Sequence, residues 1–227
     1  MSSRYLSRCA ALVLILAAAC TRQAQVRAGD PAIRGRDAGD SGTAAAVVAG
    51  SLRRFPNPVL VTQEGKAVHF YDDLVRDRVV MLNFAYTHCT GKCPRTVAQL
   101  VAAQRLLGDR FGSQITLLTL SLDPERDTPE AMREYVAAHG GRPGWTWLTG
   151  RREDIEAIRR FVGFTDRDPQ LDADRTRHTT LVLLGNDPAG RWSTVPGLVR
   201  PELIVEAILR TAGERPQRTA MQATCSP

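Results

Sequence analysis

A run of apolar residues that ends in two closely spaced cysteines constrains this chain more than any other feature. Residues 79–86 are almost continuously apolar, as strands buried on both faces of a parallel sheet are. Cys89 and Cys93 follow, and then Pro94, which suits the first turn of a helix because no amide hydrogen is needed there. Apolar residues continue at helical spacing to Leu107. The pattern therefore predicts a strand and a helix with two thiols at their junction.

The rest of the chain alternates between strand-like and helix-like segments, which predicts an α/β fold with helices on both faces of a sheet. Two cysteines at a strand-to-helix junction, followed by a later hairpin and a closing helix, favour a thioredoxin-like arrangement with an N-terminal β-hairpin extension. We predict strands at 58–62, 66–70, 79–86, 115–122, 145–149, 178–184 and 191–195, a helical turn at 71–75, and helices at 94–107, 128–140, 152–162 and 201–209.

The N-terminus has the pattern of an export signal. Arg4 and Arg8 precede an apolar run at 10–19 that is too short to span a bilayer as a helix. Small residues before Cys20 resemble a bacterial lipoprotein processing site, so we expect lipidation of Cys20 and a membrane tether. A cleaved secretory signal and an uncleaved anchor are the alternatives. The expected organisation is a signal or lipoprotein anchor at 1–20, a flexible linker at 21–54, the folded domain at 55–212 and a disordered tail at 213–227.

Composition limits the partners of the domain. The chain has 227 residues, 43% of them hydrophobic, and a formal net charge of +6. This balance suits one globular domain with tails. The arginines are scattered among acidic residues, and no basic block with interleaved aromatic residues occurs, so we do not expect nucleic acid as a partner. Export would place the cysteine pair in an oxidising compartment, where a dithiol stays reduced only with a metal, a partner or a reductant.

The cysteine pair suits either disulfide exchange or a soft metal. The thiolate attacks disulfides and also binds metal, and a helix N-terminus stabilises it. Three residues separate Cys89 from Cys93, whereas the thioredoxin motif has two, so this is not the usual oxidoreductase spacing. Lys92 adds positive charge beside the pair. Thiolates favour copper(I), and an imidazole would complete a three-coordinate site.

Four histidines compete for the place of third ligand. We interpret His69 as a surface or packing residue and His139 as a residue that complements a helix terminus. His88 adjoins Cys89, which makes joint ligation awkward, and we favour loop shaping or thiolate stabilisation for it. His178 opens a predicted strand that would run antiparallel to the cysteine strand, and its start would lie beside the thiols. Ligation by His178 and simple capping of a strand end both stay open.

A polar segment at 121–129 follows the second buried strand, and ligand-binding loops gather at such strand ends. Asp123 and Asp127 could form hydrogen bonds around the site or face a partner. For Asp127 and Thr128 we favour turn and helix-cap roles.

Three segments together resemble the Sco/SenC family: residues 84–94, residues 120–129 and the run that begins at His178. The resemblance covers roughly residues 55–212. It implies a thioredoxin-like domain tethered to the membrane of a bacterial cell envelope and facing the periplasm. It further implies that Cys89, Cys93 and His178 bind a copper ion, as Cu(I) with Cu(II) as a second candidate state.

The same resemblance implies a role in delivering copper to the dinuclear copper centre of cytochrome c oxidase, or in reducing the cysteines of that centre. The partners would be the copper-bearing subunit of the oxidase and other copper chaperones or thiol reductants. One departure from the family pattern is Arg177, which stands where the family often has an acidic residue just before the histidine. The absence of that carboxylate could reduce the basicity of the His178 imidazole.

Our main hypothesis is a copper-binding and transfer protein rather than an enzyme that turns over substrate. The alternative is a membrane-tethered thiol–disulfide reductase, with Cys89 as the attacking and Cys93 as the resolving thiol. A peroxidase is less favoured because no peroxide-activating pattern occurs in the sequence. Met221 and Cys225 are possible extra soft ligands, although a frayed tail is the simpler interpretation.

Overall fold

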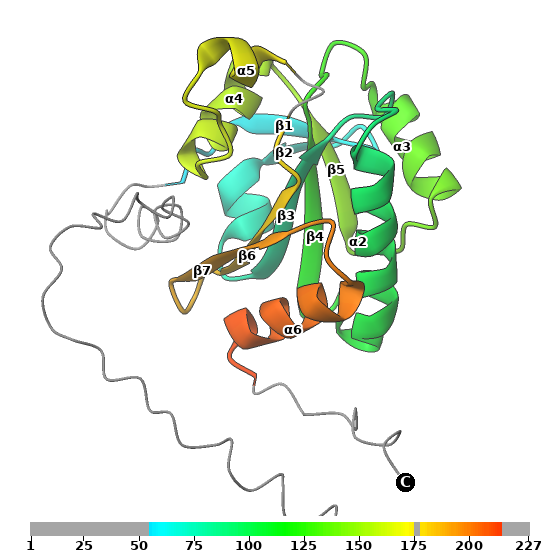
Figure 1. Ribbon diagram of the computed structural model, residues 1–227, viewed down its shortest axis with the longest axis vertical. Coiled ribbons are helices and arrows are strands. Elements are labelled where there is room, and N and C mark those ends of the chain that lie inside the picture. The colour runs from blue at the N-terminus through cyan, green and yellow to red at the C-terminus, as the bar shows by residue number, and fades with distance from the viewer. Residues whose placement is uncertain (1–54, 175–177, 215–227) are drawn as a thin grey trace, which may run out of the picture. The chain divides into compact units, whose positions relative to one another are not determined.

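A computed structural model describes residues 55–174 and 178–214, which form a mixed α/β fold around one seven-stranded sheet (Figure 1). The strand order is β2-β1-β5-β4-β3-β6-β7. Neighbours among β3, β4 and β5 are parallel, and all other neighbours are antiparallel. The strands are β1 (Val59–Thr62), β2 (Ala67–His69), β3 (Val79–Ala85), β4 (Ile115–Ser121), β5 (Trp145–Thr149), β6 (Leu181–Asn186) and β7 (Arg191–Pro196). The expected α/β class is confirmed, and the hairpin of β1 and β2 extends one edge of the sheet.

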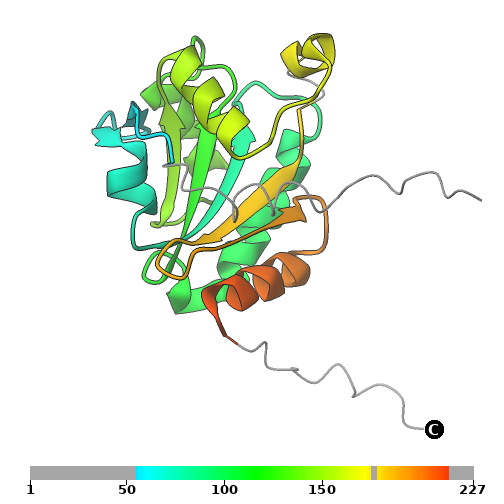
Figure 2. The same ribbon diagram turned by 90° about the vertical axis from the view of Figure 1, so that its left-hand side faces the viewer.

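Helices cover both faces of the sheet, and each face has its own apolar core. Val97 of α2, Met132 of α3 and Ile204 of α6 pack on one face. Phe70 of η1 and Ile155 of α4 pack on the other. Figure 2 shows β6 and β7 side by side with α6 next to them. The helical elements are η1 (Phe70–Val75), α2 (Cys93–Leu107), η2 (Gly108–Arg110), α3 (Pro129–Ala138), α4 (Arg152–Phe161), α5 (Pro169–Ala173) and α6 (Pro201–Ala212).

The register places the ends of three strands together. β3 pairs in parallel with β4 from Val79 opposite Ile115 to Ala85 opposite Ser121. β3 also pairs with β6 in the antiparallel sense, so the segment that enters β6 lies at the carboxyl end of β3. The loops after β3 and β4 and the segment before β6 therefore meet at one end of the sheet, as ligand-binding loops do in open α/β sheets.

Two features of the region around His178 differ from the sequence prediction. β6 begins at Leu181, so the prediction that His178 opens this strand is wrong. The amide of Leu181 donates to the side-chain oxygen of Thr179 at 3.2 Å, a local turn that competes with the strand ladder. α5 was not predicted, although Asp168 accepts the amide of Gln170 as an N-cap at 2.9 Å and Pro169 occupies the first turn.

Several predictions fall on residues outside the two described ranges. Within those ranges, no helix is long and apolar enough to cross a membrane. The features that lie outside them are the signal or anchor at 1–20 with Cys20, the linker at 21–54, Arg177, and the tail residues Met221 and Cys225.

Candidate metal and thiol site

β3 and α2 place the two thiols at one end of the sheet. β3 ends at Ala85 and α2 begins at Cys93, with Cys89 in the loop between them. Cys89 is 8% exposed and Cys93 is 2% exposed, and both thiols are free. The amide of Cys89 donates to the carbonyl of Tyr86 at 3.3 Å, which turns the loop toward the helix. One thiol therefore lies in the loop and the other at the helix entrance, as the sequence predicts.

The two thiols have opposite acidities. Burial raises the pKa of Cys89, but hydrogen bonds to its sulfur lower this pKa by more and leave it below 9.0. The donors are the Cys93 thiol, the Gly91 and Cys93 amides and the Tyr86 hydroxyl. Burial raises the pKa of Cys93 to about 12, assisted by its hydrogen bond to Cys89 and by repulsion from a Cys89 thiolate. Cys89 therefore loses its proton first, and Cys93 acts as the donor that stabilises the resulting thiolate.

His178 contacts the cysteine pair. Its Nε2 lies 3.2 Å from the Sγ of Cys93, and its ring meets the ring of Tyr86 edge-on at 6.0 Å between centroids. Burial, together with the positive charges of Arg159 and Lys92, lowers the pKa of His178 to about 4. The imidazole is therefore neutral near pH 7, which is the form that ligates metal. Its Nδ1 is buried without a hydrogen-bond partner among the described residues.

The side chains of Cys89, Cys93 and His178 thus come together as the sequence predicts, with Cys93 as the link between the other two. Two sulfurs and an imidazole nitrogen are donor types that suit copper(I). Within the described part of the chain, no three His, Cys, Asp or Glu side chains are arranged so that they could hold a metal ion as they stand. The set is therefore a hydrogen-bonded thiol–imidazole arrangement, and copper ligation by it is a proposal.

A buried carboxylate anchors the cysteine loop. Asp127 has no exposed side-chain surface and accepts hydrogen bonds from the Thr87 hydroxyl at 2.6 Å and from the Ser121 hydroxyl at 2.5 Å. It also accepts the amide of Thr87 at 3.2 Å. The interpretation of Asp127 as a turn residue is therefore incomplete, because this side chain ties the loop after β3 to the end of β4. Only the three-dimensional fold brings Thr87 to Asp127.

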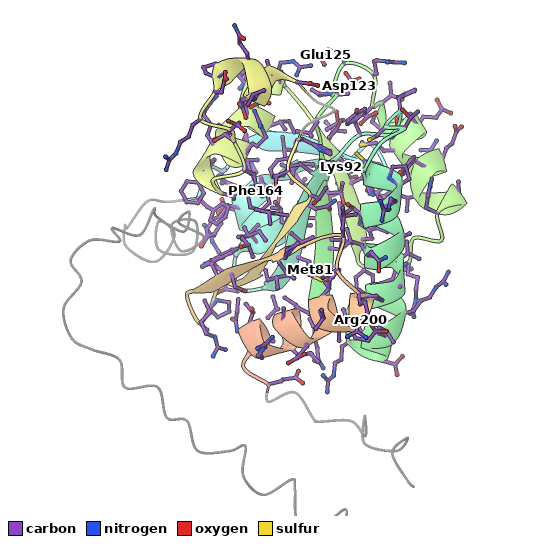
Figure 3. The ribbon with its side chains drawn as sticks, in the orientation of Figure 1. Met81, Lys92, Asp123, Glu125, Phe164 and Arg200 are labelled. Carbon is purple, nitrogen blue, oxygen red and sulfur yellow. The ribbon has the colours of Figure 1, made fainter. Side chains whose placement is uncertain are left out.

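The neighbours of Asp127 keep local roles. Thr128 caps α3, as predicted, by accepting the amide of Ala131 at 3.2 Å. Asp123 is 5% exposed, and its amide donates to the hydroxyl of Ser121 at 2.9 Å. Figure 3 shows Asp123, Glu125 and Lys92 toward the same end of the sheet. The polar segment after β4 therefore borders the thiol site.

The other histidines lie apart from the thiol–imidazole contact. The Nδ1 of His88 contacts the hydroxyl of Thr87 at 2.8 Å and lies 3.7 Å from Asp127, which agrees with a loop-shaping role. His139 stacks on Tyr135 with 4.0 Å between ring centroids and ends α3, as expected. His69 is exposed at the end of β2.

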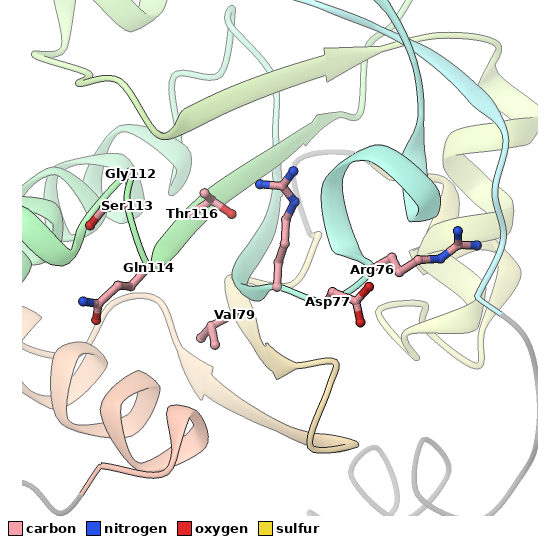
Figure 4. A pocket seen from close by; sticks show the side chains of 8 residues that line it. Arg76, Asp77, Val79, Gly112, Ser113, Gln114 and Thr116 are labelled. Carbon is pink, nitrogen blue, oxygen red and sulfur yellow. The ribbon is translucent and has the colours of Figure 1, made fainter.

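A cavity near the start of β3 and β4 lies away from the thiols (Figure 4). It has a volume of about 350 Å³ and is formed by residues 76–79, 112–114 and 116. These residues lie at the start of β3 or around the start of β4, whereas the thiols follow the end of β3. The chemistry of the thiol–imidazole arrangement, rather than cavity size, therefore identifies the candidate site.

Comparison with known proteins finds one family over nearly all of the described residues. The family model for SCO1/SenC matches residues 56–213. The protein SenC of Rhodobacter capsulatus is 26% identical over 184 residues, which cover 78% of each chain. The mitochondrial SCO1 homolog 1 of Arabidopsis thaliana is 32% identical over 101 residues, which are 44% of this chain and only 29% of that protein.

Solved structures agree with this relation. The structure of Bradyrhizobium japonicum ScoI with copper bound is 28% identical and aligns with a TM-score of 0.54, covering 67% of this chain and 96% of ScoI. The likeness confirms the thioredoxin-like fold expected from the order of strands, thiols and helices.

Proposed function

The chain belongs to the SCO1/SenC family, and on that premise we propose that it binds copper as cargo through Cys89, Cys93 and His178. It would then aid copper delivery to the dinuclear copper centre of cytochrome c oxidase. The observation that carries the proposal is the contact of 3.2 Å between the Sγ of Cys93 and the Nε2 of His178, beside the thiol of Cys89. The similarity to a ScoI protein solved with copper bound supports copper as the cargo.

The acidities of the site suggest an order of events during loading. Cys89 offers a thiolate first because its pKa lies below 9.0, and the neutral imidazole of His178 needs no deprotonation near pH 7. Cys93, with a pKa of about 12, gives up its proton only when a cation replaces it. Copper binding should therefore release protons and require the reduced dithiol.

A second candidate function is thiol–disulfide reduction, favoured by the unequal acidity of the two cysteines. Cys89 would attack a disulfide of the client as a thiolate and form a mixed disulfide. Cys93 would then attack the sulfur of Cys89, which leaves an internal disulfide and releases the reduced client. This reaction uses both cysteines and does not need His178, so the two functions are separable by mutation.

The proposed cellular setting follows from the N-terminal sequence. Cys20 would carry a lipid, residues 21–54 would link it to the domain at 55–212, and the domain would face the periplasm from a bacterial membrane. The partners would be the copper-bearing subunit of the oxidase together with copper chaperones or thiol reductants.

Copper(I) titration of the reduced protein tests the main proposal. The wild type should bind about one copper ion per chain, Cys89→Ser and Cys93→Ser should lose tight binding, and His178→Ala should bind more weakly. His69→Ala is the matched control, because this histidine is exposed and distant from the thiol–imidazole contact, and it should bind as the wild type does. A wild type that takes up no copper, or a His178→Ala variant that binds equally well, would overturn the proposal. Retained reductase activity in His178→Ala would support the second function.

A further inference from the structure

The segment that leads to His178 lacks an apolar anchor. Every described residue of the ranges 165–174 and 178–180 keeps some exposed surface, and α5 contains no buried side chain. His178 also precedes β6 by three residues, so the strand ladder does not hold it directly. Besides its contacts with Cys93 and Tyr86, the position of the imidazole therefore depends on polar contacts made by this segment.

Arg159 provides the buried polar anchor beneath the segment. It lies on α4, and its side chain is only 8% exposed. Its guanidinium donates two hydrogen bonds to Asp172 of α5, at 2.7 and 2.6 Å, and one to the carbonyl of Phe164 at 3.2 Å. A further hydrogen bond at 2.9 Å joins it to Glu156. A bidentate arginine–carboxylate pair fixes orientation as well as distance.

Asp172 extends this anchor along the chain. Besides Arg159, it accepts the amide of Asp166 at 2.7 Å, so one carboxylate joins α4, the loop after it and α5. Arg159, Asp172 and His178 also border one cavity of about 220 Å³. The Arg159–Asp172 pair and the imidazole thus form parts of the wall of one cavity.

We propose that the Arg159–Asp172 pair positions His178 against Cys93 and so sets how strongly the imidazole holds copper. The inference rests on the proposed copper-binding function. Neither residue is a ligand: the pair acts at the wall of the cavity that it shares with His178. Loss of the pair should leave both thiols in place and weaken only the contribution of His178.

Asp172→Asn is the most direct perturbation, because it keeps the size of the side chain and leaves Arg159 paired with Glu156. Asp154→Asn is the matched control. Asp154 makes the same two-bonded contact with Arg151, at 2.8 and 3.1 Å, at the N-terminal end of α4. Asp172→Glu retains the carboxylate and tests rescue.

Copper(I) affinity, measured by competition with a chromophoric chelator, should fall about 10-fold in Asp172→Asn, the scale typical for residues that orient a metal ligand. Asp154→Asn should match the wild type, and Asp172→Glu should recover most of the affinity. In a His178→Ala background, Asp172→Asn should have no further effect. An unchanged affinity in Asp172→Asn, or an equal loss with and without His178, would overturn the inference.

A measurement on the metal-free protein separates this inference from the proposed function. The imidazole nitrogen and ring-proton resonances of His178, recorded by NMR in the reduced protein, should shift in Asp172→Asn and stay unchanged in Asp154→Asn. If the wild type binds no copper, the proposed function fails whatever these resonances do. If the wild type binds copper but the resonances of His178 do not respond to Asp172→Asn, the positioning role fails alone.

Discussion

A brief pulse of iodoacetamide at pH 7 should label Cys89 much faster than Cys93 in the reduced, metal-free protein. The two thiols lie four positions apart in the chain, yet the structure lowers the pKa of Cys89 and raises the pKa of Cys93. The reagent attacks the thiolate, so the difference in ionisation should be read directly as a difference in labelling rate.

The expected ratio follows from the two pKa values. With a pKa of about 12, Cys93 is a thiolate in about 1 of 100,000 molecules at pH 7. With a pKa below 9.0, Cys89 is a thiolate in at least about 1 of 100 molecules. A more basic thiolate is also a better nucleophile, which offsets about 30-fold of this roughly 1,000-fold difference. Labelling of Cys89 should therefore be at least about 30-fold faster.

Mass analysis of the two tryptic peptides after timed pulses measures both rates in one sample. The unfolded protein in guanidinium chloride is the control and should label both cysteines at similar rates. In Cys89→Ser, labelling of Cys93 should speed up, because its repulsion from a Cys89 thiolate and its hydrogen bond to that thiolate are removed. Equal labelling in the folded wild type, or faster labelling of Cys93, would refute the reasoning.

Lowering the pH should destabilise the metal-free protein, because the pKa of His178 is about 4 in the folded protein and 6.5 ordinarily. The contribution of this imidazole to the free energy of unfolding is fully present above pH 6.5 and is lost as the pH falls toward 4. The loss should reach at most about 3 kcal/mol in urea unfolding, and a His178→Gln variant with the same pH profile would contradict this cause. Asp127→Asn should lower the free energy of unfolding by about 1–3 kcal/mol and speed hydrogen exchange of the Thr87 amide. Unchanged exchange of this amide would argue against Asp127 as the anchor of the cysteine loop. Gly185→Ala should lower the free energy of unfolding, measured by thermal unfolding, by about 1–3 kcal/mol, because a Cβ at this position would lie 2.1 Å from the ring of Trp192. An unchanged stability would show that the ring can move at little cost.

The sequence predicts those parts of the fold whose signal is local. The continuous apolar runs at 79–86 and 115–122 become β3 and β4 because a strand buried on both faces needs no polar positions. The thiols follow from the same logic, since a loop and a proline-led helix must come after β3. The approach of His178 to the thiols is also predictable, because the antiparallel pairing of β6 with β3 fixes which ends meet.

Contacts between distant segments are what the sequence does not predict. Arg159 and Arg160 are neighbours on α4, but only Arg159 is buried, because Phe164 and Asp172 supply acceptors on its side of the helix. Asp127 has the features of a turn residue until the fold brings Thr87 to it. In both cases the role depends on a partner that only tertiary structure provides.

X-ray absorption at the copper edge of the copper(I)-loaded protein tests the central claim most directly. The account predicts a first shell of two sulfur atoms and one nitrogen atom around copper in the wild type, and the loss of that nitrogen in His178→Ala with both sulfurs kept. A shell without two sulfurs, or a wild-type spectrum that His178→Ala leaves unchanged, would contradict the assignment of Cys89, Cys93 and His178 as the copper ligands.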